Sequence, residues 1–132
     1  MRRFLPIFSG IPCVFLLGCA YTHEQLAENA IAVLKDIADE LSAIRDPAGA
    51  EAAIPRLKEL GSQWRANERR MAKTKSPSTR ALKELDKKYG GQLEEAMKRY
   101  FIEVARVKKI DGGEQALAAL GEVKSEMKSN SR

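Results

Sequence analysis

The chain has 132 residues, a length sufficient for one domain and too short for two of ordinary size. Its formal net charge is +5, a mild excess of cations that by itself indicates no particular class of partner. Both cysteines, Cys13 and Cys19, lie near the start, so the remainder of the chain can form no internal disulfide. Its stability must therefore come from packing.

Residues 1–18 have the three parts of a secretory signal peptide. Arg2 and Arg3 give a positive start, residues 4–17 form an apolar middle, and the small residue Gly18 ends the segment. A transmembrane helix is the alternative interpretation. A span needs about 20 apolar residues, however, and prolines and a glycine interrupt this shorter run. The sequence therefore predicts an export signal that is cleaved off.

The end of this segment, residues 16–19, reads Leu-Leu-Gly-Cys and resembles the lipobox of bacterial lipoprotein precursors. Leu16 and Gly18 match the residues preferred in that motif, whereas Leu17 is bulkier than usual. The resemblance implies cleavage between Gly18 and Cys19 and acylation of the Cys19 thiol, which would hold the protein at a membrane. Ala20 follows the cysteine in place of an acidic residue, which implies sorting to the periplasmic face of the outer membrane.

The first helix is predicted to begin at His23, because Thr22 and Gln25 have the spacing of a capping box. Apolar residues then recur every three or four positions as far as Ile44, which places them on one helical face. Asp46-Pro47 is expected to stop this helix and to cap the next.

The second helix is predicted over residues 47–73, with an apolar stripe that includes Leu57 and Trp64. Pro55 lies inside it and removes one backbone hydrogen bond, so the helix either kinks at this residue or starts near it. The stripe keeps its phase on both sides of Pro55, which favours the kink. Ser76-Pro77 then predicts the N-cap and first turn of a third helix.

The third helix is predicted to be the longest, over residues 77–110, although Gly90-Gly91 lies within it. Its main apolar stripe runs from Leu82 to Val107. Beyond the two glycines a second apolar line widens this face, and we expect a further element to cover it.

A short fourth helix is predicted over residues 113–128, because Asp111-Gly112-Gly113 combines a helix stop with a new N-cap. The second apolar line of the third helix consists of Met97 and Phe101. We expect the fourth helix to fold back on the third and cover these two side chains.

These elements define an all-α fold, since no segment shows the alternation typical of strands. Short connections force neighbouring helices to run antiparallel. The prediction is an elongated antiparallel three-helix bundle, with the short fourth helix packed back on the third. The expected parts are a signal peptide (1–18), an acylated cysteine with a short tether (19–22), a helical domain (23–128) and a flexible tail (129–132).

Residues with catalytic or metal-binding character are sparse. His23 is the only histidine, and no cysteine pair or second imidazole has the spacing of a metal site. The glycine pairs lack the pattern that cradles phosphate. We therefore expect no enzyme activity, no cofactor, no metal and no small-molecule substrate.

The aromatic residues fall on or beside the apolar stripes, which favours packing in the core. They are Trp64, Tyr89, Tyr100 and Phe101. Trp64 has an alternative interpretation, because a large aromatic near a helix end can anchor a partner or contact lipid headgroups. The sequence leaves both open.

Positive charge gathers around the connection between the second and third helices. The cations of this "basic tip" are Arg65, Arg69, Arg70, Lys73, Lys75, Arg80, Lys83, Lys87 and Lys88. The first helix leads away from Cys19 and the second returns, so the tip is expected at the end of the domain nearest the anchor. There it could bind anionic headgroups or could simply keep the protein soluble.

Two functions follow as hypotheses. The first is a non-enzymatic interaction or scaffold module of the cell envelope, anchored through Cys19, that binds another envelope protein or a cell-wall polymer. The second is direct binding of anionic lipid or another envelope polyanion by the basic tip. Nucleic acid is a poor partner for the same patch, because an exported protein rarely meets it.

Overall fold

A computed structural model describes residues 21–121 of the chain. All regular structure in this range is helical: α2 (His23–Ser42), α3 (Pro47–Lys73), α4 (Thr79–Leu85), the π-helical segment η1 (Asp86–Gly90), α5 (Gly91–Val107) and α6 (Gly113–Ala119). The predicted all-α class is confirmed. The predicted leader, Cys19, residues 122–128 of the predicted fourth helix and the tail lie outside the described residues. The fourth helix begins at Gly113 as predicted but ends at Ala119, and a turn at residues 120–121 follows it.

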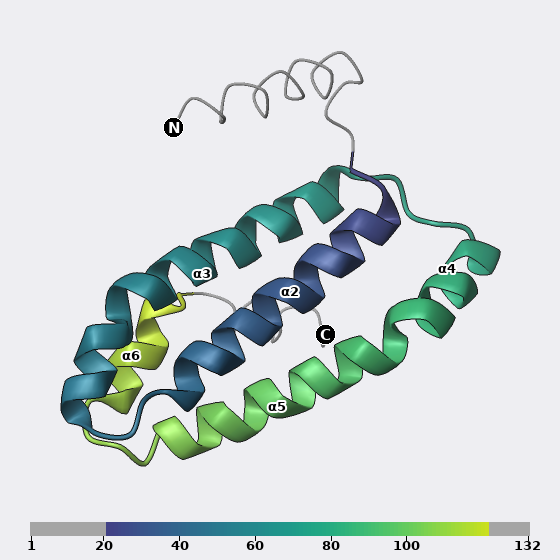
Figure 1. Cartoon of the computed structure of the whole chain (residues 1–132). Coiled ribbons are helices and arrows are strands. Elements are labelled where there is room, and N and C mark those ends of the chain that lie inside the picture. Colours follow the sequence, from purple (N-terminus) through teal and green to yellow (C-terminus); the bar gives the residue numbers. More distant parts are fainter. Residues whose placement is uncertain (1–20, 122–132) are drawn as a thin grey trace, which may run out of the picture.

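The helices pack around α2, which lies between α3 and α5 (Figure 1). α3 runs back along α2, α5 follows on the other side of α2, and α3 and α5 make little direct contact. Within residues 21–121, none of the helices combines the length and apolarity that a membrane span requires.

The apolar stripes predicted for the first two helices form the centre of the core. The largest side chains excluded from solvent include Leu34, Ile37 and Leu41 of α2 and Leu57 and Leu60 of α3. Because full burial of such a side chain contributes about 1.5–3 kcal/mol, this central seam carries much of the stability.

Three of the four predicted helix starts are confirmed, at His23, Pro47 and Gly113. Thr22 accepts from the Gln25 amide at 3.1 Å while the Gln25 side chain accepts from the Thr22 amide, which completes the capping box. Asp46 accepts from the Gly49 amide at 2.7 Å and caps α3. The third helix, however, is capped by Ser78 and not by Ser76, so it begins at Thr79.

The second helix is continuous through Pro55, so a helix start near that residue is excluded. α3 extends from Pro47 to Lys73, and its axis bends toward its N-terminal end (Figure 1). Proline lacks the amide that would pair with the carbonyl four residues earlier, and this loss permits a bend without ending the helix.

The third helix is not the single regular helix that the sequence predicted. Five residues, Asp86–Gly90, form a π-helical turn that separates α4 from α5. Such a turn inserts an extra residue into the helix and rotates the side chains on one side relative to the other. The predicted stripe is therefore split: Tyr89, Ala96 and Tyr100 are buried, whereas Leu82 is 52% exposed.

The fourth helix packs chiefly on α3, which corrects the prediction that it folds back on the third helix. A Cβ atom at Gly61 of α3 would overlap the carbonyl of Leu120, so the glycine permits a close backbone approach that no other residue allows. Phe101 consequently stays 50% exposed. Gly112 precedes α6 with φ of 82°, the left-handed conformation expected of a glycine at a helix stop.

Candidate binding surface at the proximal end

The domain has a proximal end, where the described chain begins, and a distal end opposite to it. The proximal end consists of the first turn of α2, the last turns of α3, the connection 74–78, and α4 (Figure 1). Two contacts tie its parts together: the Asn67 amide donates to the Leu26 carbonyl at 3.2 Å, and the Arg70 guanidinium lies 4.5 Å from the centre of the Tyr21 ring. The connection that carries the basic tip therefore lies beside the residues that lead into α2.

Arg65 differs from the other cations of the basic tip because it contacts α6. Its guanidinium donates to the Leu120 carbonyl at 3.1 Å and thereby joins α3 to the end of α6. A Cβ atom at Gly121 would also overlap this guanidinium. Arg65 therefore has a structural contact, and its part in a binding surface stays a prediction.

Three further cations of the tip have partners within the domain. Arg70 stacks on Tyr21, Lys88 pairs with Glu24 at 3.2 Å, and Arg80 lies 3.7 Å from Glu84. The Arg80 pair is exposed on both sides, so it contributes little stability and leaves the guanidinium accessible.

The remaining five cations have no carboxylate of residues 21–121 within ion-pair distance. They are Arg69, Lys73, Lys75, Lys83 and Lys87, and all five are exposed. These five exposed side chains are positively charged and have no paired carboxylate, so they would attract an anion that approached this end.

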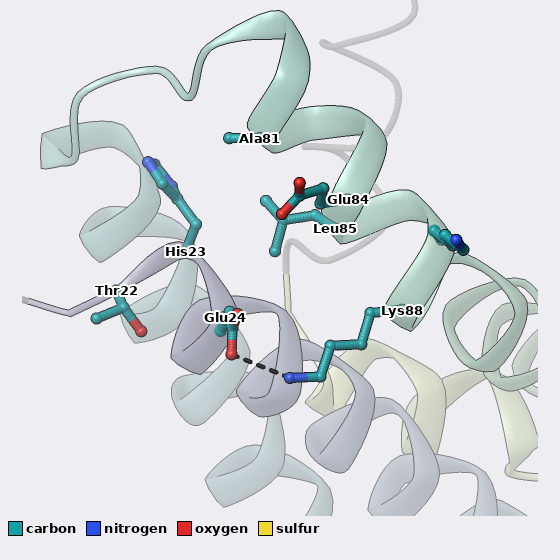
Figure 2. Close-up of a pocket in the computed structure, with 8 residues that line it drawn as sticks. Thr22, His23, Glu24, Ala81, Glu84, Leu85 and Lys88 are labelled. Carbon is teal, nitrogen blue, oxygen red and sulfur yellow. Dashed lines mark hydrogen bonds and ion pairs between the residues drawn. The ribbon is translucent and has the colours of Figure 1, made fainter.

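α4 stands apart from the rest of the proximal end. None of its residues is buried. Figure 2 shows Ala81, Glu84 and Leu85 on one side of an open cleft and the first turn of α2 on the other, with the Lys88–Glu24 ion pair at its base. This cleft has a volume of about 830 Å³ and is lined largely by polar and charged side chains.

A second, smaller cleft of about 330 Å³ lies between α2, the end of α3 and the connection 74–78. Most of its lining is apolar: Leu26, Ala27, Ala30, Met71, Pro77, Leu85 and Leu93. His23 and Leu85 line both clefts, and Lys75 lies at the smaller one. Its volume falls at the lower end of the range of small-molecule sites, about 300–1,000 Å³.

The π-helical segment is held against α2 by two side-chain contacts. The Tyr89 hydroxyl donates to Glu28 at 2.7 Å, and this hydrogen bond to a carboxylate raises the pKa of Tyr89 above its ordinary value of 10.0. The hydrogen bond to Glu24 likewise raises the pKa of Lys88 above 10.5. These contacts fix the point from which α4 diverges.

His23 lies in the first turn of α2 and lines both clefts. Within residues 21–121, no three side chains of His, Cys, Asp or Glu converge in a way that could hold a metal ion. Trp64 lies in the core with 8% of its surface exposed, in agreement with the packing interpretation and not with an exposed anchor.

Neither cleft was predicted from the sequence. The signal that could have indicated them is the Gly90-Gly91 pair, which is poorly suited to a regular helix and marks the place where the third helix changes direction. Comparison of the chain with protein-family models, with curated proteins and with solved structures finds no match.

Proposed function

We propose that this protein is a lipoprotein of the bacterial cell envelope whose helical domain acts as a non-enzymatic interaction or scaffold module. In this proposal residues 1–18 are a signal peptide, and the acylated Cys19 holds the domain at the periplasmic face of the outer membrane. Three main helices then serve as an elongated antiparallel bundle that presents its surfaces to another envelope protein or a cell-wall polymer.

The pattern Leu16-Leu17-Gly18-Cys19 is the observation that carries the anchor. The accessible side chains at the proximal end support the interaction role, because open clefts and cations that have no carboxylate partner in residues 21–121 gather close to the start of α2. An anchor at Cys19 would bring these groups near the membrane, since only Ala20, Tyr21 and Thr22 separate the cysteine from the first helix.

The anchor is tested by the intact mass of the protein purified from a bacterial membrane fraction. We expect a chain that begins at Cys19 and carries diacylglycerol on its thiol, while Cys19→Ala abolishes acylation and leaves the leader attached. A Cys19→Ala protein that is still processed and still partitions with membranes contradicts the proposal.

The interaction role is tested by crosslinking in intact cells followed by mass spectrometry. A single protein partner present in stoichiometric amount supports the module. Adducts with lipid or glycan alone support the second candidate instead, which is direct binding of an anionic surface by the basic tip.

The second candidate is favoured by the five cations that have no carboxylate partner within residues 21–121. Each Lys or Arg close to an anionic surface contributes about 1 kcal/mol to membrane binding at low salt. Because Arg70 of the same basic tip contacts the Tyr21 ring, the tip lies beside the residues that lead into α2 and would orient the domain with its proximal end against the headgroups.

This orientation can be measured in the acylated protein reconstituted into vesicles. Cys19 is the only cysteine left after processing and its thiol is blocked, so Ser76→Cys supplies one site for an environment-sensitive dye. We expect a blue shift with anionic vesicles that high salt reverses and that the pair Arg69→Glu and Lys73→Glu abolishes. Ala48→Cys at the distal end is the matched position, and Lys58→Glu with Lys109→Glu is the matched charge control. A dye signal that ignores salt and anionic lipid excludes the second candidate.

A further inference from the structure

The smaller cleft of the proximal end combines an apolar interior with a cationic rim. Leu26 and Ala30 of α2 and Leu93 of α5 contribute to its apolar lining, and Met71, 48% exposed, stands at its edge. Leu26 and Ala30 are nearly buried, so Met71 supplies much of the exposed apolar surface. Such surface gains free energy when an apolar ligand displaces water from it.

The rim has the opposite character. It carries a cation, Lys75, which lies at the cleft itself. No carboxylate of residues 21–121 lies within ion-pair distance of this lysine. An apolar hollow with such a cation at its rim is complementary to an amphiphile with an anionic head.

We propose that this cleft binds one acyl chain of an anionic membrane lipid, whose phosphate lies against Lys75. This inference rests on the proposed function, because it requires the proximal end to lie at the membrane. The lipid would then be captured from the bilayer that holds the anchor.

The size of the cleft favours an acyl chain over a helix of a partner protein. A docked helix needs a groove long enough for apolar anchors over two turns. The cleft of about 330 Å³ is small for that purpose, whereas a single hydrocarbon chain needs only a narrow apolar channel. The phosphate of an anionic lipid also supplies a partner for the ammonium group of Lys75 at the rim.

Photocrosslinking tests the proposal with the processed, acylated protein in vesicles. The probes are phosphatidylglycerol and phosphatidylcholine, each with a diazirine near the end of one acyl chain. We expect the phosphatidylglycerol probe to label peptides that contain residues 26–30 or 71–77, and the phosphatidylcholine probe to label them severalfold less. Equal labelling by both probes, or labelling confined to residues 19–22, overturns the proposal.

Two variants separate the hollow from its charges. Ala27→Phe places a ring in the cleft and should abolish the labelling, whereas Ala105→Phe on the exposed face of α5 should leave it unchanged. Lys75→Gln should reduce the labelling about fivefold, as expected for one cation near an anionic surface, and Lys109→Gln at the distal end should not. Lys75 is exposed, so its variant remains decisive even if Ala27→Phe fails to fold. Labelling that survives Lys75→Gln unchanged contradicts the proposal.

The intact mass of the protein distinguishes failure of the proposed anchor from failure of the proposed lipid site. If Cys19 carries no lipid, the proposed function is wrong whatever the probes label. If Cys19 is acylated and the cleft peptides stay unlabelled, the proposed function stands and the lipid site is wrong. A photoreactive methionine analogue at Met71 that captures a protein in cells, and no lipid, also overturns the lipid site.

Discussion

At the distal end of the domain Ile44, Val107 and Ala116 are almost completely excluded from solvent, whereas at the proximal end no residue of α4 is buried. The distal backbone also approaches closely, since a Cβ atom at Gly113 would overlap the Val107 carbonyl. The proximal end has clefts of about 830 and 330 Å³, and a cleft of about 320 Å³ lies at the distal end. Exposed cations without a carboxylate partner in residues 21–121 are found at both ends, with five of them in the basic tip. The tightest packing is found where the helices meet, and the largest of these clefts lies where α4 diverges from α2.

Both ends use arginines, but for different purposes. Arg106 of α5 donates to the carbonyls of Ile44 and Leu41, each at 2.7 Å, and the Leu41 carbonyl also accepts from the Ile44 amide at 3.0 Å. Arg69 of α3 is exposed and has no such acceptor among the hydrogen bonds of the described residues. An arginine therefore has a structural role at the distal end, whereas Arg69 at the proximal end is accessible to a partner.

The largest contrast in the free energy of unfolding is expected between two leucines that each belong to a predicted apolar stripe. Leu57→Ala removes a side chain with no exposed surface and should lower the free energy of unfolding by about 2–5 kcal/mol. Leu82→Ala, on the half-exposed face of α4, should change it by about 0.5 kcal/mol or less. Urea denaturation followed by circular dichroism measures both. Equal losses would show that α4 is packed as tightly as the core.

The next effect concerns the close approach of α6 to α3. Gly61→Ala adds a Cβ atom that meets the Leu120 backbone, so the end of α6 must shift at a cost of about 1–3 kcal/mol. Gly91→Ala is the matched control, because a Cβ atom there meets nothing within 4 Å. Hydrogen exchange should show lost protection in α6 for the first variant alone, and unchanged protection in α6 would place this helix elsewhere.

A smaller effect is expected at the end of α2. Arg106→Met keeps the aliphatic stem but removes the donor to the Ile44 and Leu41 carbonyls, and because the Leu41 carbonyl still accepts from the Ile44 amide, the change should cost about 1–2 kcal/mol. Arg99→Met removes an exposed ion pair with Asp39 and should cost about 1 kcal/mol or less. Thermal unfolding of the two variants ranks them, and the reverse order would contradict the structural role of Arg106.

The smallest effect is a change in the dependence of stability on pH at η1. The Glu28 carboxylate raises the pKa of Tyr89 in the folded state above 10.0. The hydrogen bond from the protonated Tyr89 hydroxyl therefore stabilises the fold fully below about pH 10, and this contribution is lost as the pH rises through the folded pKa. The pKa of Lys88 is also raised, so its contribution to stability is likewise lost as the pH rises above 10.5.

Tyr89→Phe should therefore weaken the loss of stability above pH 10, and Glu28→Gln should act likewise by removing the partner. Unfolding in urea at a series of alkaline pH values gives both slopes. Slopes identical to that of the unmodified protein would show that the hydrogen bond does not form in solution.

Local patterns predicted most of the helices because the determinants lie within a few residues of one another. The capping box at Thr22 and the cap at Asp46 require only a side chain and an amide three positions apart. The burial of Leu34, Leu57 and Trp64 follows from apolar spacing on a single face. Those predictions hold whatever the rest of the chain does.

The candidate site was predicted only in part. Eight of the nine cations assigned to the basic tip lie at the proximal end or on the α4–η1 segment that adjoins it, whereas Arg65 binds α6. The accessible clefts depend on the direction of α4 after the π-helical turn, which is a relation between elements and has no counterpart in the spacing of residues.

By itself, then, the sequence determined the all-helical class, the caps, the faces that are buried in α2 and α3, and the gathering of positive charge beside one connection. Only the tertiary structure decided that α6 packs on α3 through Gly61, that Arg65 is structural, and that α4 diverges from α2. The physical reason is the separation along the chain of the residues that interact. Caps and apolar stripes depend on residues that are close in sequence. Helix docking depends on the fit between surfaces whose residues are far apart in sequence, such as Gly61 and Leu120.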